Sequence, residues 1–518
     1  MRLGELLQRL KKHYNSADRL RLRLHVSEKT IHTWLHKSEE ELQRLQPDHV
    51  EAIKRAARDI GLAPELEVDG PQLWNAHLPY AANISYEPLL PAEVPTFRTH
   101  RTEFLGYALN SPFGASSSVL TSTPHRIRFL ARTGCDLISF VTVRSSERDP
   151  HPGRNVLFCA ESTLPLDPRA RKHPSIEVGD EGGRYRSTFG MMNRFGIPSP
   201  PPEVWKARFN TARLEMLAGQ LLILSVTGSS RPNEPFSALV KDFVRVTKLG
   251  VEAGASVLEL NVGNHNTSGR EDGLHLDLES TLEICRELAK ERLNAKIILK
   301  IGFMQTEPLK RFILETAPYV HGYSAINTFP SAGLQKGQLE LEPAFGKPGV
   351  RAGVSGAPIQ RLSLHCISDL VEIRSAERLN NIGIIAASGV VSPENVKTLL
   401  DLGADAVQAT TAFWSDSYFG LKVRQYLDEE LQHRESSADH EREEARVLWS
   451  RAVQELEKEV GGGTAVAEEI NRAGLAVFLE WDRNHEDTIS LGPRRALAPS
   501  VRDFKERIRD RMRRSPRR

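Results

Sequence analysis

Cysteine is scarce in this chain of 518 residues, and its four cysteines, Cys135, Cys159, Cys285 and Cys366, never form a CxxC pair. A zinc or iron–sulfur site held by thiolates alone is therefore not expected. No apolar run approaches the roughly 20 residues of a membrane span, and the first residues, MRLGE, lack the apolar core of a signal peptide. We therefore expect a cytoplasmic protein with reduced thiols and no membrane association.

The formal net charge is also small, only +2 at neutral pH. The overall charge does not argue for a nucleic-acid partner, although nine Arg or Lys residues against three acids crowd residues 502–518. Basic ends of this kind either contact phosphate or form a solvated helix face.

The chain is longer than one average domain, so we expect two or three domains.

Residues 1–65 are predicted to be helical, because apolar residues recur three and four positions apart. Ser27 is a candidate N-cap for a helix that places Ile31, Trp34 and Leu35 on one face. This pattern resembles the recognition half of a helix-turn-helix, so DNA binding through residues 1–65 is one interpretation. A helical bundle that caps the next domain or mediates a homodimer explains the same residues.

Residues 66–103, which carry several prolines, are predicted to be a linker that lies over the next domain.

Between residues 104 and 431 short apolar runs alternate with longer amphipathic stretches, a pattern typical of alternating strands and helices in a parallel α/β fold. Candidate strands lie near residues 113, 137, 222, 257, 297, 323, 384 and 405. Eight such units predict a (β/α)8 TIM barrel. The proline-, glycine- and charge-rich stretch 160–215 is predicted to be an inserted lid, and residues 432–518 a helical extension with a basic tail.

Small or polar residues end most of these strands. In a (β/α)8 barrel the carboxyl ends of the strands carry the active site, so the candidate residues are those that end the strands or sit in the insertion: Ser116, Ser117, Thr142, Asn193, Asn261, Asn264, His265, Asn266, Lys300, Asn327, Thr328, Ser388, Gly389, Thr410 and Thr411. A lysine such as Lys300 at the end of an apolar strand either faces an anion or an electron-rich ring, or extends to solvent.

Seven motifs in order resemble the dihydroorotate dehydrogenase family, flavin enzymes that bind FMN and oxidise a dihydropyrimidine. The family's N-x-S-(C/S)-P-N resembles NVGNHN at 261–266, and its G-L-S-G-x-x-I resembles GVSGAPI at 353–359. The remaining five motifs resemble residues 193–199, 299–300, 325–328, 384–390 and 407–411. The resemblance covers roughly residues 104–431.

The resemblance implies FMN as cofactor and a pyrimidine-like small molecule as substrate, with dihydroorotate as the default. Lys300 would lie at the pyrimidine edge of the flavin and act in catalysis. The implied cofactor residues are Ser116, Ser117, Thr142, Asn261, Lys300, Thr328, Ser355, Gly356, Ser388, Gly389, Thr410 and Thr411. The implied substrate residues are Asn193, Asn261, Asn266, Asn327 and Thr328.

The chain departs from the family where the catalytic base is expected. Asn264 stands in the place of the family's catalytic cysteine or serine, and an amide cannot act as a general base near neutral pH. The neighbouring His265 either takes over the proton transfer or has a structural or substrate-contact role. We therefore expect an FMN-dependent oxidoreductase of pyrimidine biosynthesis that converts dihydroorotate to orotate. The alternatives are a non-catalytic flavin- or pyrimidine-sensing regulator with a DNA-binding N-terminus, or an enzyme like the tRNA dihydrouridine synthases.

Overall fold

The structure is a computed structural model that describes most of residues 71–431, together with residues 26–42 and a few other positions before residue 54. Within 71–431 the undescribed positions are 77, 92–93, 96–100, 161, 171–174, 180–188, 232, 264–272, 337–340 and 346–349. The chain divides into two compact units, Met1–Leu427 and Asp428–Arg518. The predicted helical extension at 432–518 falls outside the described residues.

Eight parallel strands form the central sheet, in the order β3-β16-β15-β11-β10-β9-β8-β4. They are β3 (Phe113–Ala115), β4 (Leu137–Val143), β8 (Leu221–Val226), β9 (Val257–Asn261), β10 (Lys296–Ile301), β11 (Gly322–Ala325), β15 (Gly383–Ala386) and β16 (Ala406–Ala409). Strands such as β8, with sequence LLILSV, are buried throughout because a parallel sheet is covered on both faces. All eight strands lie where the sequence predicts them, and the (β/α)8 barrel is confirmed.

The sheet closes between its first and last strands. The Asp136 amide, just before β4, donates a 2.8 Å hydrogen bond to the Phe113 carbonyl in β3. At this seam a Cβ on Gly114 would lie 1.7 Å from the Leu137 carbonyl oxygen, so only glycine permits the approach.

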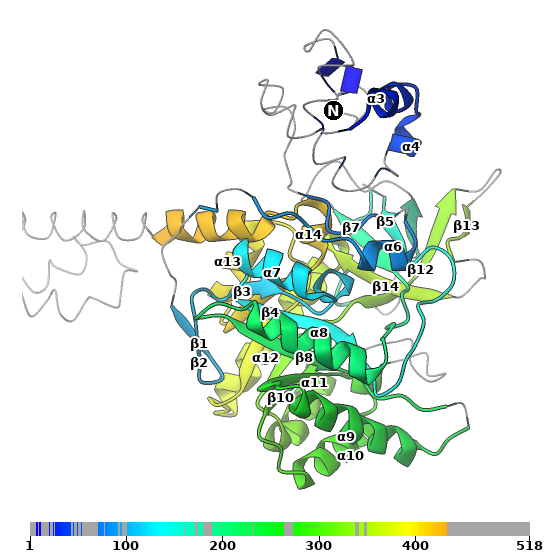
Figure 1. Cartoon of the computed structure of the whole chain (residues 1–518). Helices are drawn as coiled ribbons and strands as arrows, with labels where there is room; N and C mark the ends of the chain where they lie inside the picture. Colours follow the sequence, from blue (N-terminus) through cyan, green and yellow to red (C-terminus); the bar gives the residue numbers. More distant parts are fainter. Residues whose placement is uncertain are drawn as a thin grey trace, which may run out of the picture. The chain divides into compact units, whose positions relative to one another are not determined.

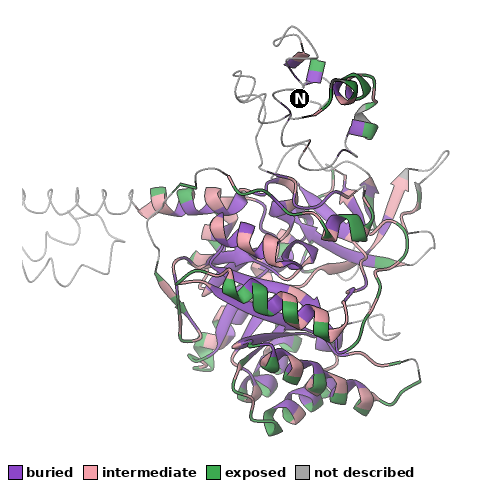
Figure 2. Cartoon of the chain, in the orientation of Figure 1, coloured by how far each residue is buried: buried purple, intermediate pink, exposed green. Residues whose placement is uncertain are grey.

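A helix follows each barrel strand along the chain, and these helices lie around the outside of the sheet (Figure 1). These helices are α7 (Pro124–Arg132), α8 (Pro202–Leu214), α9 (Phe236–Glu252), α10 (Leu278–Lys290), α11 (Thr306–Thr316), α12 (Gln360–Ala376), α13 (Pro393–Asp401) and α14 (Thr411–Ser415). Figure 2 shows buried inner faces and exposed outer faces on several of them. Helix α13 begins with Ser392 as N-cap and Pro393 in the first turn.

A second sheet of six strands has the order β13-β12-β14-β7-β5-β6. Its strands are β5 (Val156–Cys159), β6 (Ile176–Gly179), β7 (Gly190–Asn193), β12 (Phe329–Lys336), β13 (Leu341–Pro343) and β14 (Arg351–Gly356). The stretch 160–215, predicted to be one inserted lid, therefore divides into strands of this sheet and helix α8, which belongs to the barrel. The other three strands of this sheet, β12 to β14, come from a later part of the chain, where the sequence analysis placed a motif at 353–359 but predicted no strand.

Residues 71–86 are folded onto the barrel. Helix α6 (Tyr80–Ile84) contains Asn83, whose amide donates to the carbonyls of Asn75 and Leu78 at 2.9 and 3.1 Å. The buried Arg126 of α7 donates to the Asn83 carbonyl. The predicted linker thus contains an ordered segment that is fixed by side-chain hydrogen bonds.

The hairpin of β1 (Thr102–Phe104) and β2 (Tyr107–Leu109) contributes to the apolar interior of the barrel. Phe104 and Leu109 belong to one buried cluster with inward-facing strand residues such as Leu137, Val257 and Ile298. Near the N-terminus, the described elements are α3 (Glu28–Leu35) and α4 (Glu39–Leu42). Ser27 is the N-cap of α3 and accepts from the Thr30 amide at 3.1 Å, as predicted.

Candidate active site

A cavity of about 1150 Å³, including its open mouth, lies at the carboxyl ends of the barrel strands. The six-stranded sheet supplies the opposite wall through β7 and β14. Every predicted cofactor or substrate residue that the structure describes lines this one cavity: Ser116, Ser117, Thr142, Asn193, Asn261, Lys300, Asn327, Thr328, Ser355, Gly356, Ser388, Gly389, Thr410 and Thr411. Asn264, His265 and Asn266 are not among the described residues. Fold geometry therefore gathers residues that lie up to about 300 positions apart in the sequence.

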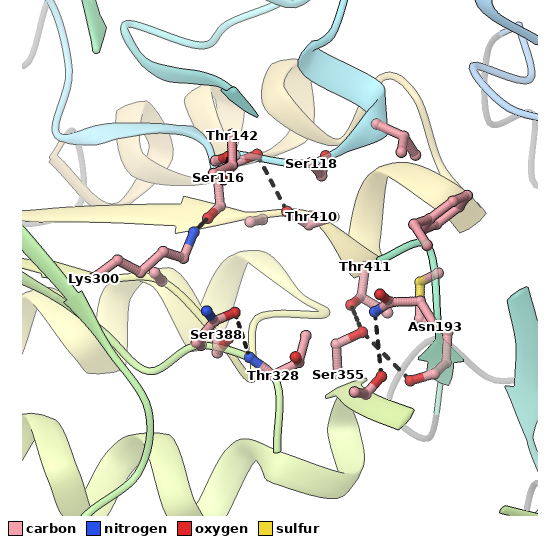
Figure 3. Close-up of a pocket in the computed structure, with 18 of the residues that line it drawn as sticks. Ser116, Ser118, Thr142, Asn193, Lys300, Thr328, Ser355, Ser388, Thr410 and Thr411 are labelled. Carbon is pink, nitrogen blue, oxygen red and sulfur yellow. Dashed lines mark hydrogen bonds between the residues drawn. The ribbon is translucent and has the colours of Figure 1, made fainter. Parts of the chain in front are cut away.

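Lys300 forms part of the cavity floor. Its side chain projects from β10 and is only 4% exposed, so it does not extend to solvent. The ammonium donates a 2.8 Å hydrogen bond to Ser116 Oγ, as Figure 3 shows, and lies 3.6 Å from a Glu259 carboxylate oxygen. This fixed donor is suited to an acceptor atom on a ligand in the cavity.

Five side chains near Lys300 form a network of hydrogen bonds. The Asn327 amide donates to Asn261 Oδ1 at 2.9 Å, and Asn261 Nδ2 donates to Thr142 Oγ1 at 3.1 Å. Thr142 Oγ1 also lies 2.9 Å from the hydroxyls of Ser117 and Ser225. Because each amide is held by its neighbours, both can offer a ligand a remaining donor or acceptor in a fixed direction.

A third part of the cavity wall consists of hydroxyls and glycines. Thr411 Oγ1 donates to Ser355 Oγ at 2.9 Å (Figure 3), and Thr410 Oγ1 contacts the Ser116 carbonyl at 3.4 Å. Gly356 and Gly389 have φ values of +83° and +76°, which side chains rarely adopt. Several hydroxyls beside these two glycines, with no carboxylate among the described lining residues, suit an anionic group such as a phosphate.

Asn193 marks the wall across the cavity from Lys300 (Figure 3). It lies in β7, and its amide donates to the Gly353 carbonyl of β14 at 3.2 Å. Phe195 and Trp414 continue this wall with aromatic rings. Trp74, from the segment before the barrel, packs against both of them, with ring centroids 5.6 and 6.1 Å apart.

The aromatic wall is held from behind by a buried cation. The Arg126 guanidinium lies 5.1 Å from the centroid of the Trp74 ring, a distance typical of a cation–π contact. Burial lowers the pKa of Arg126 to about 10 and raises the pKa of Tyr80, which packs on Trp74, to about 12. Arg126 is therefore charged and Tyr80 neutral at physiological pH, so neither group changes its charge when the pH varies around 7.

Three features of the cavity were not found from the sequence. These are the aromatic residues Phe195 and Trp414, the packing of Trp74 behind them, and the buried Glu259 beneath Lys300. Glu259 had a readable signal, because it alternates with Val257 and Asn261 and so shares their inward face. Among the described lining residues, Lys300 is the only one with an acidic or basic side chain.

In the part of the chain that the structure describes, no group of three or more His, Cys, Asp or Glu side chains could hold a metal ion. None of the described helices is both long and apolar enough to cross a membrane.

A closed (β/α)8 barrel with a polar cavity at the carboxyl ends of its strands has the architecture of a barrel enzyme. A sequence model of the family described as dihydroorotate dehydrogenase matches residues 176–434. The chain belongs to the dihydroorotate dehydrogenase family, and is an oxidoreductase that acts on CH–CH bonds. Strands β3 and β4 precede the matched region but complete the same barrel.

Individual relatives of the chain are also named dihydroorotate dehydrogenases. The chain is 27% identical to the dihydroorotate dehydrogenase of Dictyostelium discoideum over 333 residues, which cover 62% of this chain and 86% of that protein. It is 30% identical to the dihydroorotate dehydrogenase (quinone) of Clavibacter sepedonicus over 177 residues, or 34% of this chain and 48% of that protein. It is 24% identical to the catalytic subunit of dihydroorotate dehydrogenase B (NAD(+)) of Enterococcus faecalis over 254 residues, or 48% and 74%.

Proposed function

We propose that the barrel, residues 104–431, binds FMN in the cavity and oxidises a dihydropyrimidine, with dihydroorotate as the expected substrate. The observation that carries this proposal is the convergence of the described candidate residues on one cavity. Family membership favours an enzyme over the alternative of a non-catalytic regulator. The predicted DNA-binding role of residues 1–65 stays a prediction.

The residues of the cavity fit an FMN molecule. Gly356 and Gly389 pack closely against the chain behind them, because a Cβ would lie 2.5 Å from the Phe189 carbonyl oxygen and 2.7 Å from Gln360 Cα. Ser355, Ser388, Thr410 and Thr411 offer hydroxyls beside them, which would hold the phosphate. Lys300 would donate to the pyrimidine edge of the flavin ring, with Ser116, Ser117, Thr142, Asn261 and Thr328 as further contacts. When bound, FMN supplies an acceptor for the hydride that leaves the substrate.

The asparagines of the cavity fit a planar ring with carbonyl groups and a carboxylate. Asn193 would contact the substrate from β7, while Asn261, Asn327 and Thr328 would contact it from the barrel. Because hydrogen bonds already orient Asn261 and Asn327, they would bind the ring with little loss of side-chain entropy. Asn266 is proposed as a further substrate contact.

Oxidation of a CH–CH bond to a C=C bond removes a hydride from one carbon and a proton from its neighbour. We propose His265 as the group that accepts the proton on its imidazole. Its position soon after β9 supports this role, because β9 ends at Asn261 in the cavity wall. Asn264, which replaces the family's cysteine or serine, would contact the substrate through its amide, which has no basicity for proton transfer.

Steady-state kinetics with dihydroorotate and an artificial electron acceptor test the substrate assignment. Asn193→Ala and Asn327→Ala should raise the KM by about tenfold to a hundredfold, since each removes a hydrogen bond to a polar ligand. Asn380→Ala, in a cleft remote from this cavity, is the matched control and should leave KM unchanged. An unchanged KM in both cavity variants would reject the assignment.

A further inference from the structure

Glu259 is a buried carboxylate that the proposed mechanism does not use. It lies in β9 between Val257 and Asn261, which point into the barrel as part of its interior core and of the cavity wall. Residues two positions apart on a strand share a face, so Glu259 also points inward. Its side chain is completely buried.

The only described cation near Glu259 is Lys300, whose ammonium lies 3.6 Å from one carboxylate oxygen. Neither carboxylate oxygen of Glu259 has a hydrogen-bond partner among the described residues. An ionised carboxylate in such surroundings is strongly unfavourable unless an opposite charge stabilises it. The same reasoning applies to Lys300, whose one hydrogen bond is to the neutral Ser116 hydroxyl. Each group therefore depends on the other to remain charged and buried.

We infer that Glu259 is the counter-ion of Lys300: a positioning residue that holds the ammonium at the cavity floor and offsets its charge. Lys300 then presents a hydrogen-bond donor to a ligand while the floor as a whole stays close to neutral. This limits how strongly the protein stabilises negative charge on a bound ring. That consequence rests on the proposed FMN site, whereas the ion pair itself does not.

A double-mutant cycle in the protein without FMN tests the ion pair. Glu259→Gln and Lys300→Met should each raise the unfolding equilibrium constant by about a hundredfold or more, because each leaves one buried charge unpaired. The double variant should be at least tenfold more stable than the product of the two effects predicts. A folded double variant alongside a single variant that does not fold would be the same result in its extreme form. Effects that simply multiply would overturn the inference.

The reduction potential of bound FMN provides a readout that a purely structural role would not move. Glu259→Gln should raise the midpoint potential by about 30 mV, a tenfold change in the two-electron equilibrium, because the Lys300 charge is no longer offset. Lys300→Met should lower the potential, and the double variant should lie between the two single variants. Glu283→Gln, which removes an exposed carboxylate from α10, is the control and should leave the potential unchanged.

An unchanged potential in Glu259→Gln would overturn the proposed offset of charge at the cofactor. A wild-type protein that takes up no FMN would instead overturn the proposed function. In that case the unfolding cycle still decides whether Glu259 and Lys300 form the pair.

Discussion

Gly356 provides a sharp test of the cavity wall, because its backbone conformation and its close packing both exclude a side chain. Its φ of +83° and ψ of −149° lie in a region occupied almost only by glycine. A Cβ would lie 2.5 Å from the Phe189 carbonyl oxygen and 2.7 Å from Thr411 Cγ2. We expect Gly356→Ala to destabilise the barrel and to displace Thr411 from Ser355.

Gly106 is a matched control in the β1–β2 turn. It also has a positive φ, of +85°, but no atom lies within 4 Å of the position that a Cβ would take. Alanine there should cost about 1–2 kcal/mol for the left-handed conformation alone. At Gly356 the conformation costs about 1–3 kcal/mol and the steric overlap about 1–3 kcal/mol more, roughly 2–6 kcal/mol together. The smaller entropy of the unfolded alanine chain affects both variants alike.

Urea unfolding followed by tryptophan fluorescence measures the stability difference, and fluorescence titration measures FMN affinity. Gly356→Ala should be at least 1 kcal/mol less stable than Gly106→Ala, given the roughly 1–3 kcal/mol overlap term. It should also bind FMN at least about tenfold more weakly, a difference of roughly 1.4 kcal/mol. Equal stability of the two variants, together with equal FMN affinity, would refute the packing described for this wall.

Three further predictions concern other parts of the chain. Thr142→Val keeps the shape of the side chain but removes the hydroxyl that contacts Asn261, Ser117 and Ser225. The free energy of unfolding, measured in urea, should fall by about 1–3 kcal/mol, and a fall below about 0.3 kcal/mol would contradict the network. Burial raises the pKa of the Cys159, Cys285 and Cys366 thiols to about 12. A thiol reagent at pH 8 should therefore label them only after unfolding. Their contribution to the free energy of unfolding should be lost progressively as the pH rises from about 9 to about 12. His265→Ala should slow turnover by about 10²–10⁴-fold, whereas a loss below tenfold would reject its role as the proton acceptor.

The barrel could be predicted because its strands are short apolar runs at regular spacing. A strand such as β8, buried on both faces, has an almost continuous hydrophobic sequence that no loop imitates. The polar strand ends, including Lys300 and Asn327, are equally visible because they interrupt these runs. Their positions in the cavity follow from the closure of the sheet, so the sequence pattern was sufficient to predict where they lie.

The second sheet could not be predicted in the same way. Strand β12, with sequence FPSAGLQK, contains a proline and a glycine and lacks a continuous apolar face. It pairs antiparallel with β13 and β14, but also in parallel with β6, more than 150 residues earlier. Such long-range pairing leaves no local periodicity in the sequence.

Glu259 illustrates a different difficulty. Its alternation with Asn261 predicts an inward direction, but its pairing with Lys300 depends on the register of β9 and β10. In that register Lys300 lies opposite Asn261, so the lysine and Glu259 are neighbours on the same inward face. Charge pairs inside a barrel therefore become visible only when the strands have been placed side by side.

The most direct test of the central claim is the visible absorbance spectrum of the purified protein, recorded before and after anaerobic addition of dihydroorotate. We predict flavin absorbance that bleaches on addition, because hydride passes from the substrate to bound FMN. Flavin absorbance that persists would contradict dihydroorotate as the substrate, and a colourless protein that takes up no added FMN would contradict the proposed cofactor site.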